Sequence, residues 1–81
     1  MSNAEKYLNV FTETFEIAPE EAESLEYQGI AAWDSVGHMN LVSAVEKAFD
    51  IMMLTDDIID LSSFEKGKEI LASKYDVNFE E

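Results

Sequence analysis

The fold of this chain is decided by residues 33–49, WDSVGHMNLVSAVEKAF. Apolar side chains recur there every three or four residues, which is the spacing of one face of an α-helix. The stripe consists of Met39, Val42, Val45 and Phe49, widened by Val36, Leu41 and Ala48. Asp34 or Ser35 offers a side-chain oxygen to cap the first turn. The stretch therefore predicts one long amphipathic helix that begins beside an Asp-Ser pair.

A second amphipathic pattern precedes this helix. Leu8, Phe11 and Phe15 predict a helix that ends near residue 16, and Ser2 and Glu5 are spaced as a capping box at its start. Residues 18–21 predict a short helical turn, with proline at its first position. The Glu-rich stretch that follows predicts a long ordered loop, held by its own apolar residues. These are Leu25, Tyr27, Ile30 and Trp33.

Two shorter helices are expected after a connector at residues 50–54. Thr55 is placed to cap the first of them, with two acidic residues in the first turn and Ile58, Ile59 and Leu61 pointing inward. Residues 62–65, Ser-Ser-Phe-Glu, have the form of a capping box for the last helix. Its apolar residues are Phe64, Ile70, Leu71 and Tyr75. The chain thus predicts an all-α fold, a small four-helix bundle with a long loop between the first and second helices and a short third helix.

Length and composition limit the classes of protein to be considered. The 81 residues include no cysteine, 5 Lys+Arg and 18 Asp+Glu, for a net charge of −13. We expect one domain over residues 1–81, with a core at about 4–75 and flexible ends at 1–3 and 76–81. The acidity argues against binding to nucleic acid, and the absence of a long apolar run argues against membrane insertion. We therefore expect a cytoplasmic monomer whose partners present basic patches.

Ser35 is the residue best placed to carry chemistry. It stands at the start of the clearest helix, where free backbone N–H groups and the helix dipole favour a phosphate esterified to its hydroxyl. An Asp-Ser pair that merely caps the helix is the simpler alternative. A Ser35–His38 nucleophile and base pair is disfavoured, because adjacent helical turns rarely aim such a pair correctly. A single histidine with no cysteine does not build a zinc site, so we expect no metal centre and no metal catalysis.

Three segments together widen the pattern beyond the Asp-Ser pair. Residues 34–42 (DSVGHMNLV), residues 45–50 (VEKAFD), and the acidic short helix followed by Leu61-Ser62-Ser63-Phe64 resemble the acyl carrier protein family, in register over about residues 8–71. The resemblance implies that Ser35 is the attachment point of 4′-phosphopantetheine, transferred from coenzyme A by a separate transferase. It also implies that Asp34 helps to dock that transferase. Trp33 before the pair, and glycine and histidine after it, are more similar to carriers of specialised pathways than to the carrier of fatty-acid synthesis.

The resemblance implies two further sets of residues. The expected partner surface consists of Val36, Gly37, His38, Asn40 and Glu46. The candidates for a pocket that shelters the acyl chain are Met39, Val42, Phe49, Met53, Ile58 and Leu61, for which ordinary core packing is the alternative. Acyl- or aminoacyl-loading and acyl-transfer enzymes would then be the partners. The rival functions are an unmodified acidic interaction subunit with the same fold and an acidic decoy that mimics nucleic acid.

Overall fold

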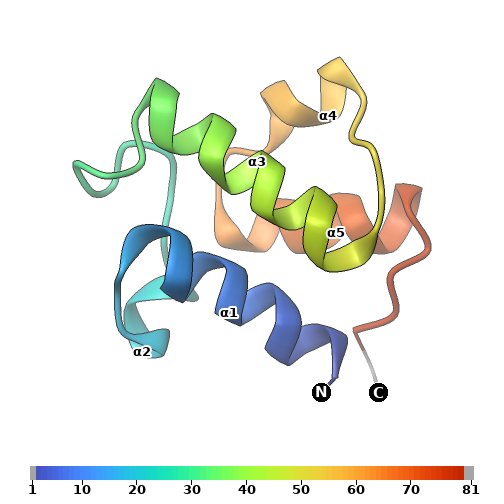
Figure 1. Ribbon diagram of the computed structural model, residues 1–81, viewed down its shortest axis with the longest axis horizontal. Coiled ribbons are helices and arrows are strands. Elements are labelled where there is room, and N and C mark those ends of the chain that lie inside the picture. The colour runs from blue at the N-terminus through green and yellow to red at the C-terminus, as the bar shows by residue number, and fades with distance from the viewer. Residues whose placement is uncertain (1, 80–81) are drawn as a thin grey trace.

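Two long helices, α1 (Asn3–Phe15) and α3 (Ser35–Phe49), pack against each other in opposite directions across the molecule (Figure 1). The computed structural model describes residues 2–79. The remaining helices are the one-turn α2 (Pro19–Ala22), the short α4 (Thr55–Asp60) and α5 (Phe64–Lys74). In Figure 1, α4 lies at the top, with α3 between it and α1, and α5 passes behind the second half of α3. The all-α fold and the order of its elements are confirmed, including the turn at Pro19.

The buried face of α1 differs in part from the predicted stripe. Tyr7 and Phe11 are 1% and 0% exposed, and Phe15 and Val10 complete the face, whereas Leu8 is only half-buried. The Tyr7 ring lies 4.7 Å from the Phe64 ring, and its hydroxyl donates a hydrogen bond of 2.6 Å to the Phe64 carbonyl oxygen. Burial raises the pKa of the Tyr7 hydroxyl well above its usual range. A tyrosine that can satisfy its hydroxyl is thus buried in preference to a leucine one residue away.

Three helices begin with a side-chain cap, and the structure decides which residue provides it. Ser2 caps α1, Asp34 caps α3, and Ser63 caps α5 through its hydroxyl oxygen, which accepts from the Lys66 N–H at 3.0 Å. The capping box expected from Ser62 to Glu65 is therefore wrong by one residue. Thr55 is also not a cap, because it is the first residue inside α4 and Leu54 precedes it.

The long loop between α2 and α3 is held in place by buried side chains and by a backbone bridge. Leu25 and Trp33 are buried, as predicted, while Tyr27 is 38% exposed. An isolated antiparallel bridge joins Glu26 to Ser63, and within residues 2–79 it is the whole of the β-structure. In this bridge Tyr27 N–H donates to the Ser62 carbonyl oxygen at 2.8 Å. These backbone hydrogen bonds attach the loop to the connection between α4 and α5.

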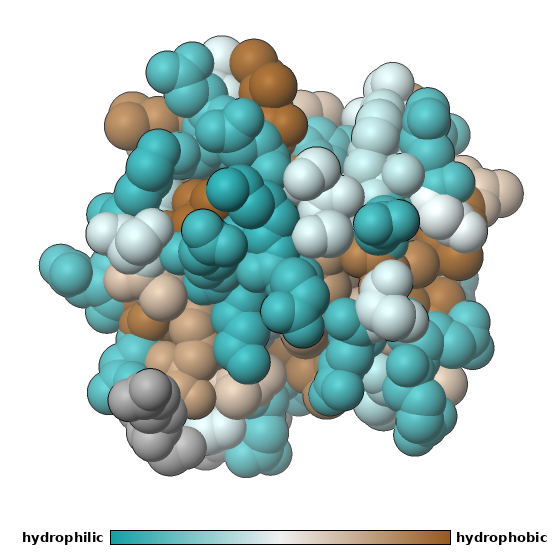
Figure 2. Space-filling view, turned by 180° about the vertical axis from the view of Figure 1, so that it is seen from behind, coloured by the Kyte–Doolittle hydropathy of each residue, from teal (hydrophilic) through white to brown (hydrophobic). Residues whose placement is uncertain are grey.

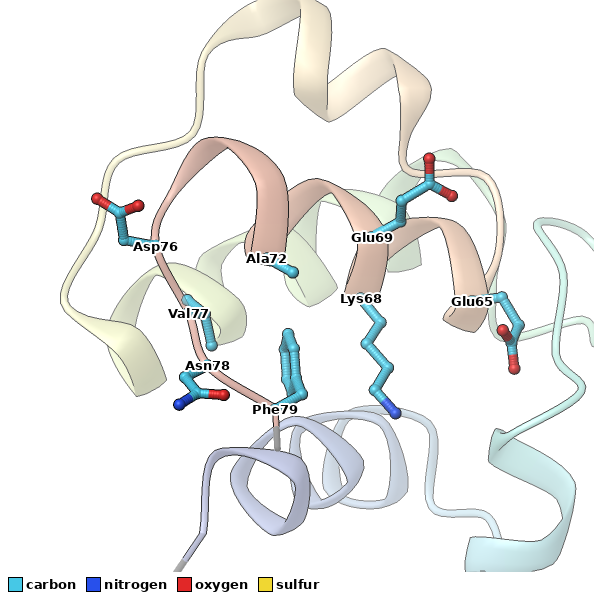
Figure 3. A pocket seen from close by; sticks show the side chains of 8 residues that line it. All are labelled: Glu65, Lys68, Glu69, Ala72, Asp76, Val77, Asn78 and Phe79. Carbon is cyan, nitrogen blue, oxygen red and sulfur yellow. The ribbon is translucent and has the colours of Figure 1, made fainter. Parts of the chain in front are cut away.

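The C-terminal segment reaches further into the core than the predicted boundary at about residue 75. Val77 is 7% exposed and lies in the hydrophobic core, and the Phe79 ring lies 5.6 Å from the Tyr7 ring. Figure 3 shows Phe79 beside the Lys68 side chain, whose ammonium is 5.6 Å from the ring centroid. Burial of two apolar side chains explains why this segment packs as part of the domain. At the other end, Asn3 belongs to α1, so the predicted start of the core at about residue 4 is close.

Hydrophilic side chains cover most of the face seen in Figure 2, with smaller hydrophobic areas between them. The molecule measures 30 × 27 × 18 Å. Within residues 2–79, no helix is long and apolar enough to cross a membrane, and the longest, α3, has 15 residues.

Candidate functional site

Ser35 is the first residue of α3, and its side chain is exposed. The preceding Asp34 has extended backbone geometry, and its carboxylate Oδ1 accepts from the Gly37 N–H at 2.9 Å. Asp34 is therefore the helix cap, and Ser35 is released from that role. The Ser35 hydroxyl has one described neighbour for a hydrogen bond, the Tyr27 hydroxyl at 3.4 Å. A substituent on Ser35 would leave the capping interaction intact.

The start of α3 is electrostatically suited to a phosphate ester. After Asp34, the first turn of this helix contains no acidic residue. The first amides of a helix point away from its body without intrahelical partners, and the aligned peptide dipoles place partial positive charge there. Of these amides, Gly37 is taken by the Asp34 side chain and His38 by the Asp34 carbonyl oxygen. The two amides before them, at Ser35 and Val36, have no partner within the helix.

The half-buried His38 and the buried Trp33 form a hydrogen-bonded pair near the start of α3. Trp33 is 0% exposed, and its indole N–H donates to His38 Nδ1 at 3.0 Å. Because Nδ1 accepts, the other ring nitrogen, Nε2, carries the hydrogen, and it donates to the Ile58 carbonyl oxygen at 2.7 Å. His38 thus connects the loop before α3 to α4, and both of its nitrogens are used. It is half-buried, so the structure gives this member of the expected partner surface a structural role, and Trp33 is enclosed in the core.

Gly37 is also buried and belongs to the structure of the site rather than to a partner surface. A Cβ atom at this position would collide with the Ala32 carbonyl oxygen and would lie 3.4 Å from the Phe15 ring. The close approach of α3 to the end of the loop therefore requires glycine. This contact sets where the loop delivers Trp33 and Asp34.

The other residues of the expected partner surface separate into two groups. Val36 is 70% exposed and Asn40 is exposed, so both are available to a partner. Glu46 is half-buried, and its carboxylate Oε2 accepts from the Met53 N–H at 2.9 Å. Glu46 thus fixes the connector between α3 and α4, which is a structural role that its place in the sequence did not reveal.

A cavity of about 240 Å³ opens next to Ser35, between the long loop, the first turns of α3 and the end of α4. Its lining consists of Tyr27, His38, Ile58, Ile59, Leu61 and Ser62. Tyr27 connects the cavity to the serine, because it lines the one and contacts the other. A larger groove of about 720 Å³ lies between α5 and residues 76–79 (Figure 3), and it shares no lining residue with the surroundings of Ser35.

The structure divides the predicted acyl-pocket residues. Ile58 and Leu61 line the cavity beside Ser35. Val42 and Met53 are buried in the hydrophobic core at 2% and 6% exposure, Phe49 packs against that core, and Met39 is 51% exposed. These four do not line the cavity. Tyr27, His38, Ile59 and Ser62 were not predicted as lining, because the loop that brings Tyr27 to α4 has no regular spacing to read.

α4, which supplies one wall of the cavity, is fastened to α5 by a buried carboxylate. Asp57 is 1% exposed, and its two oxygens accept from the Lys74 ammonium at 2.7 Å and from the Tyr75 hydroxyl at 2.6 Å. The hydrogen bond from Lys74, followed by that from Tyr75, lowers the pKa of the Asp57 carboxyl. Ile59 was expected to point inward, but it is 71% exposed, because residues two apart lie on opposite sides of a helix and α4 buries Asp57.

Among residues 2–79, no group of three acidic or histidine side chains is arranged to hold a metal ion. No family model, curated protein or solved structure matches this chain.

Proposed function

We propose that this protein is an acyl carrier protein, of the specialised and discrete type, which carries 4′-phosphopantetheine on Ser35 and performs no catalysis itself. The observation that carries the proposal is the exposed Ser35 hydroxyl at the first position of a 15-residue helix, capped by the preceding Asp34. The helix order, with a long loop before α3 and a short α4, supports a four-helix bundle of the acyl-carrier type.

The residues around Ser35 fit the group that the proposal requires. The Ser35 oxygen would form the ester bond to phosphorus, and the dipole and first amides of α3 would favour a phosphate at this end of the helix. When attached, the group supplies a thiol that holds acyl or aminoacyl intermediates as thioesters. The chain has no cysteine of its own, so such chemistry has to come from an attached group. Asp34 keeps the first turn of α3 closed whether or not Ser35 is modified.

The surface beside Ser35 supports contact with enzymes that present both basic and apolar groups. Val36 and Met39 are 70% and 51% exposed on α3, and Ile59 is 71% exposed on the neighbouring α4. The net charge of −13 would attract partners with Lys and Arg patches and speed their encounter. These partners would be the phosphopantetheinyl transferase and the enzymes that load and receive the acyl group.

Intact mass spectrometry tests the proposal directly. The protein is incubated with coenzyme A, magnesium and a promiscuous phosphopantetheinyl transferase, alongside Ser35→Ala and Ser43→Ala. Ser43 is an exposed serine of the same helix and serves as the matched control. One added phosphopantetheine is expected on the wild type and on Ser43→Ala, and none on Ser35→Ala. The helical circular dichroism of Ser35→Ala is expected to stay that of the wild type, because Asp34 provides the cap.

The absence of any addition to folded wild-type protein, with this transferase and with those of several pathways, would contradict the proposal. An unmodified interaction subunit would then be favoured, and a nucleic-acid mimic would be recognised by competition with nucleic acid for basic proteins. Both alternatives retain function in Ser35→Ala, whereas a carrier loses it entirely.

A further inference from the structure

Tyr27 is the side chain that the long loop presents to Ser35. Its hydroxyl lies 3.4 Å from the Ser35 oxygen, and the residue is 38% exposed. We propose that Tyr27 is a positioning residue for the group on Ser35, and that its hydroxyl donates a hydrogen bond to the attached phosphodiester. The inference rests on the proposed function, because it concerns the group that a carrier holds on Ser35.

The two hydroxyls differ in what they can do once Ser35 is modified. In the unmodified protein, either oxygen can donate to the other. An esterified Ser35 oxygen has no hydrogen to donate, and the phosphodiester beside it is an anion that only accepts. The Tyr27 hydroxyl keeps its hydrogen and is then the donor of the pair. A hydrogen bond to a charged acceptor is shorter and stronger than one between neutral groups, so modification should tighten the contact between the loop and α3.

The chain around Ser35 offers a phosphodiester neutral donors. No lysine or arginine occurs from residue 7 through residue 46, a span that includes the whole long loop and most of α3. Neither segment therefore supplies a cation to this end of the helix. The first amides of α3 favour a phosphate from the side of the helix. The Tyr27 hydroxyl is the corresponding donor on the side of the loop.

Tyr27 is already held in place in the unmodified protein. Its backbone N–H donates to the Ser62 carbonyl oxygen at 2.8 Å. Its ring contacts the Trp33 and His38 rings edge to face, with centroid distances of 6.2 and 5.4 Å. These two rings are fixed in turn by the hydrogen bond between them. A side chain that is ordered in advance loses little conformational freedom on making a contact, which favours its bond to the phosphodiester.

Tyr27→Phe separates this role from packing, because phenylalanine keeps the ring and removes only the hydroxyl. Ser24→Ala removes a hydroxyl from an exposed position of the same loop and is the matched control. The wild type and both variants are loaded with the transferase, and phosphorus NMR reports the phosphodiester. In Tyr27→Phe the resonance is expected to move toward its position in loaded protein unfolded by urea, where the contact is absent. In Ser24→Ala it is expected to keep the wild-type position.

The response of each protein to loading is a second measurement. The change in melting temperature on loading is expected to be less favourable in Tyr27→Phe than in the wild type by at least about 2 °C, because the variant lacks the hydrogen bond. Ser24→Ala is expected to respond as the wild type does. Equal responses and equal phosphorus resonances for the wild type and Tyr27→Phe would overturn the inference. Equal effects of Ser24→Ala and Tyr27→Phe would overturn it as well.

The wild-type protein keeps the inference falsifiable where Tyr27→Phe does not fold. The chain has three tyrosines, and the hydroxyls of Tyr7 and Tyr75 already donate to the Phe64 carbonyl oxygen and to the Asp57 carboxylate. In protein labelled with carbon-13 at the tyrosine Cζ atoms, loading is expected to shift the Tyr27 signal and to leave the other two in place. A Tyr27 signal that stays in place would overturn the inference.

These outcomes distinguish the role of Tyr27 from the carrier function. Loading that succeeds but leaves the Tyr27 signal, the phosphorus resonance and the response of Tyr27→Phe unchanged would remove the role of Tyr27 and leave the carrier function standing. Failure to load the folded wild type would overturn the carrier function, and this inference with it.

Discussion

At position 37 the absence of a side chain lets α3 start where it does. The Ala32 carbonyl oxygen occupies the space that a Cβ atom would need, and Phe15 lies just beyond it. The loop can therefore come close enough for Asp34 to cap the helix and for Trp33 to reach His38. The start of α3, and with it the position of the Ser35 hydroxyl, therefore depends on glycine at position 37.

Gly37→Ala is expected to lower the free energy of unfolding by about 1–3 kcal/mol, in spite of the better helix propensity of alanine. The physical reason is that the Ala32 carbonyl group belongs to the backbone and cannot rotate away. Urea denaturation followed by circular dichroism measures the change. Asn40→Ala, at an exposed position of the same helix, is the control and is expected to change stability by less than about 0.5 kcal/mol. Equal stabilities for the two variants would contradict the close contact at Gly37.

At the scale of the element, α4 depends on contacts that its own sequence does not supply. It has six residues and no side-chain cap. A helix this short does not persist alone. Asp57 joins it to Lys74 and Tyr75 at the end of α5, and His38 joins the Ile58 carbonyl oxygen to α3. The wall of the cavity that α4 supplies is therefore only as stable as these few hydrogen bonds.

Asp57→Asn is expected to destabilise the fold most strongly near neutral pH. The pKa of the Asp57 carboxyl is lowered in the folded state, so its contribution to stability is complete above the ordinary carboxyl pKa of about 4 and is lost as the pH falls through the lowered value. The difference in free energy of unfolding between wild type and variant should be constant above about pH 5 and shrink below pH 4. Denaturant titrations across this range measure it. Asp56→Asn removes the same charge from an exposed neighbour and should show no such profile.

The sequence predicted elements better than the contacts between them. Spacing and caps locate α1, α3 and α5, because helical periodicity and capping oxygens are local properties. The burial of Asp57 and the exposure of Ile59 could not be predicted, since they depend on Lys74 and Tyr75, 17 and 18 residues away. Ser35 and Asp34 could be singled out from one segment, because a helix cap and the residue after it are local features. Tyr27 joins them only through the bridge between Glu26 and Ser63.

At the scale of the whole molecule, charge is distributed unevenly. No lysine or arginine occurs from residue 7 through residue 46, and α5 carries three of the five lysines, Lys66, Lys68 and Lys74. The longest dimension of the molecule is 30 Å. In about 10 mM salt the screening length is about 30 Å, so nearly all of the carboxylates repel one another. Repulsion among the carboxylates should therefore lower the stability of the folded state at low ionic strength.

The melting temperature is expected to rise by several degrees between about 10 mM and about 500 mM sodium chloride, as screening relieves this repulsion. Differential scanning calorimetry in a series of salt concentrations measures the change. The double variant Glu13→Gln and Glu23→Gln removes two exposed carboxylates and is expected to respond less steeply. A melting temperature that stays flat over the whole range would contradict self-repulsion as a determinant of stability.

Trp33 gives the molecule an optical reporter at the place of interest. It is the one tryptophan of the chain, it is shielded from water, and its indole N–H is bonded to a residue that lines the cavity. Its fluorescence should therefore be emitted at short wavelength in the folded protein and shift to the red on unfolding. Because the indole is bonded to His38, which lines the cavity, a group that enters the cavity should alter the emission without exposing the ring. Fluorescence alone can then report both whether the cavity is occupied and whether the chain is folded.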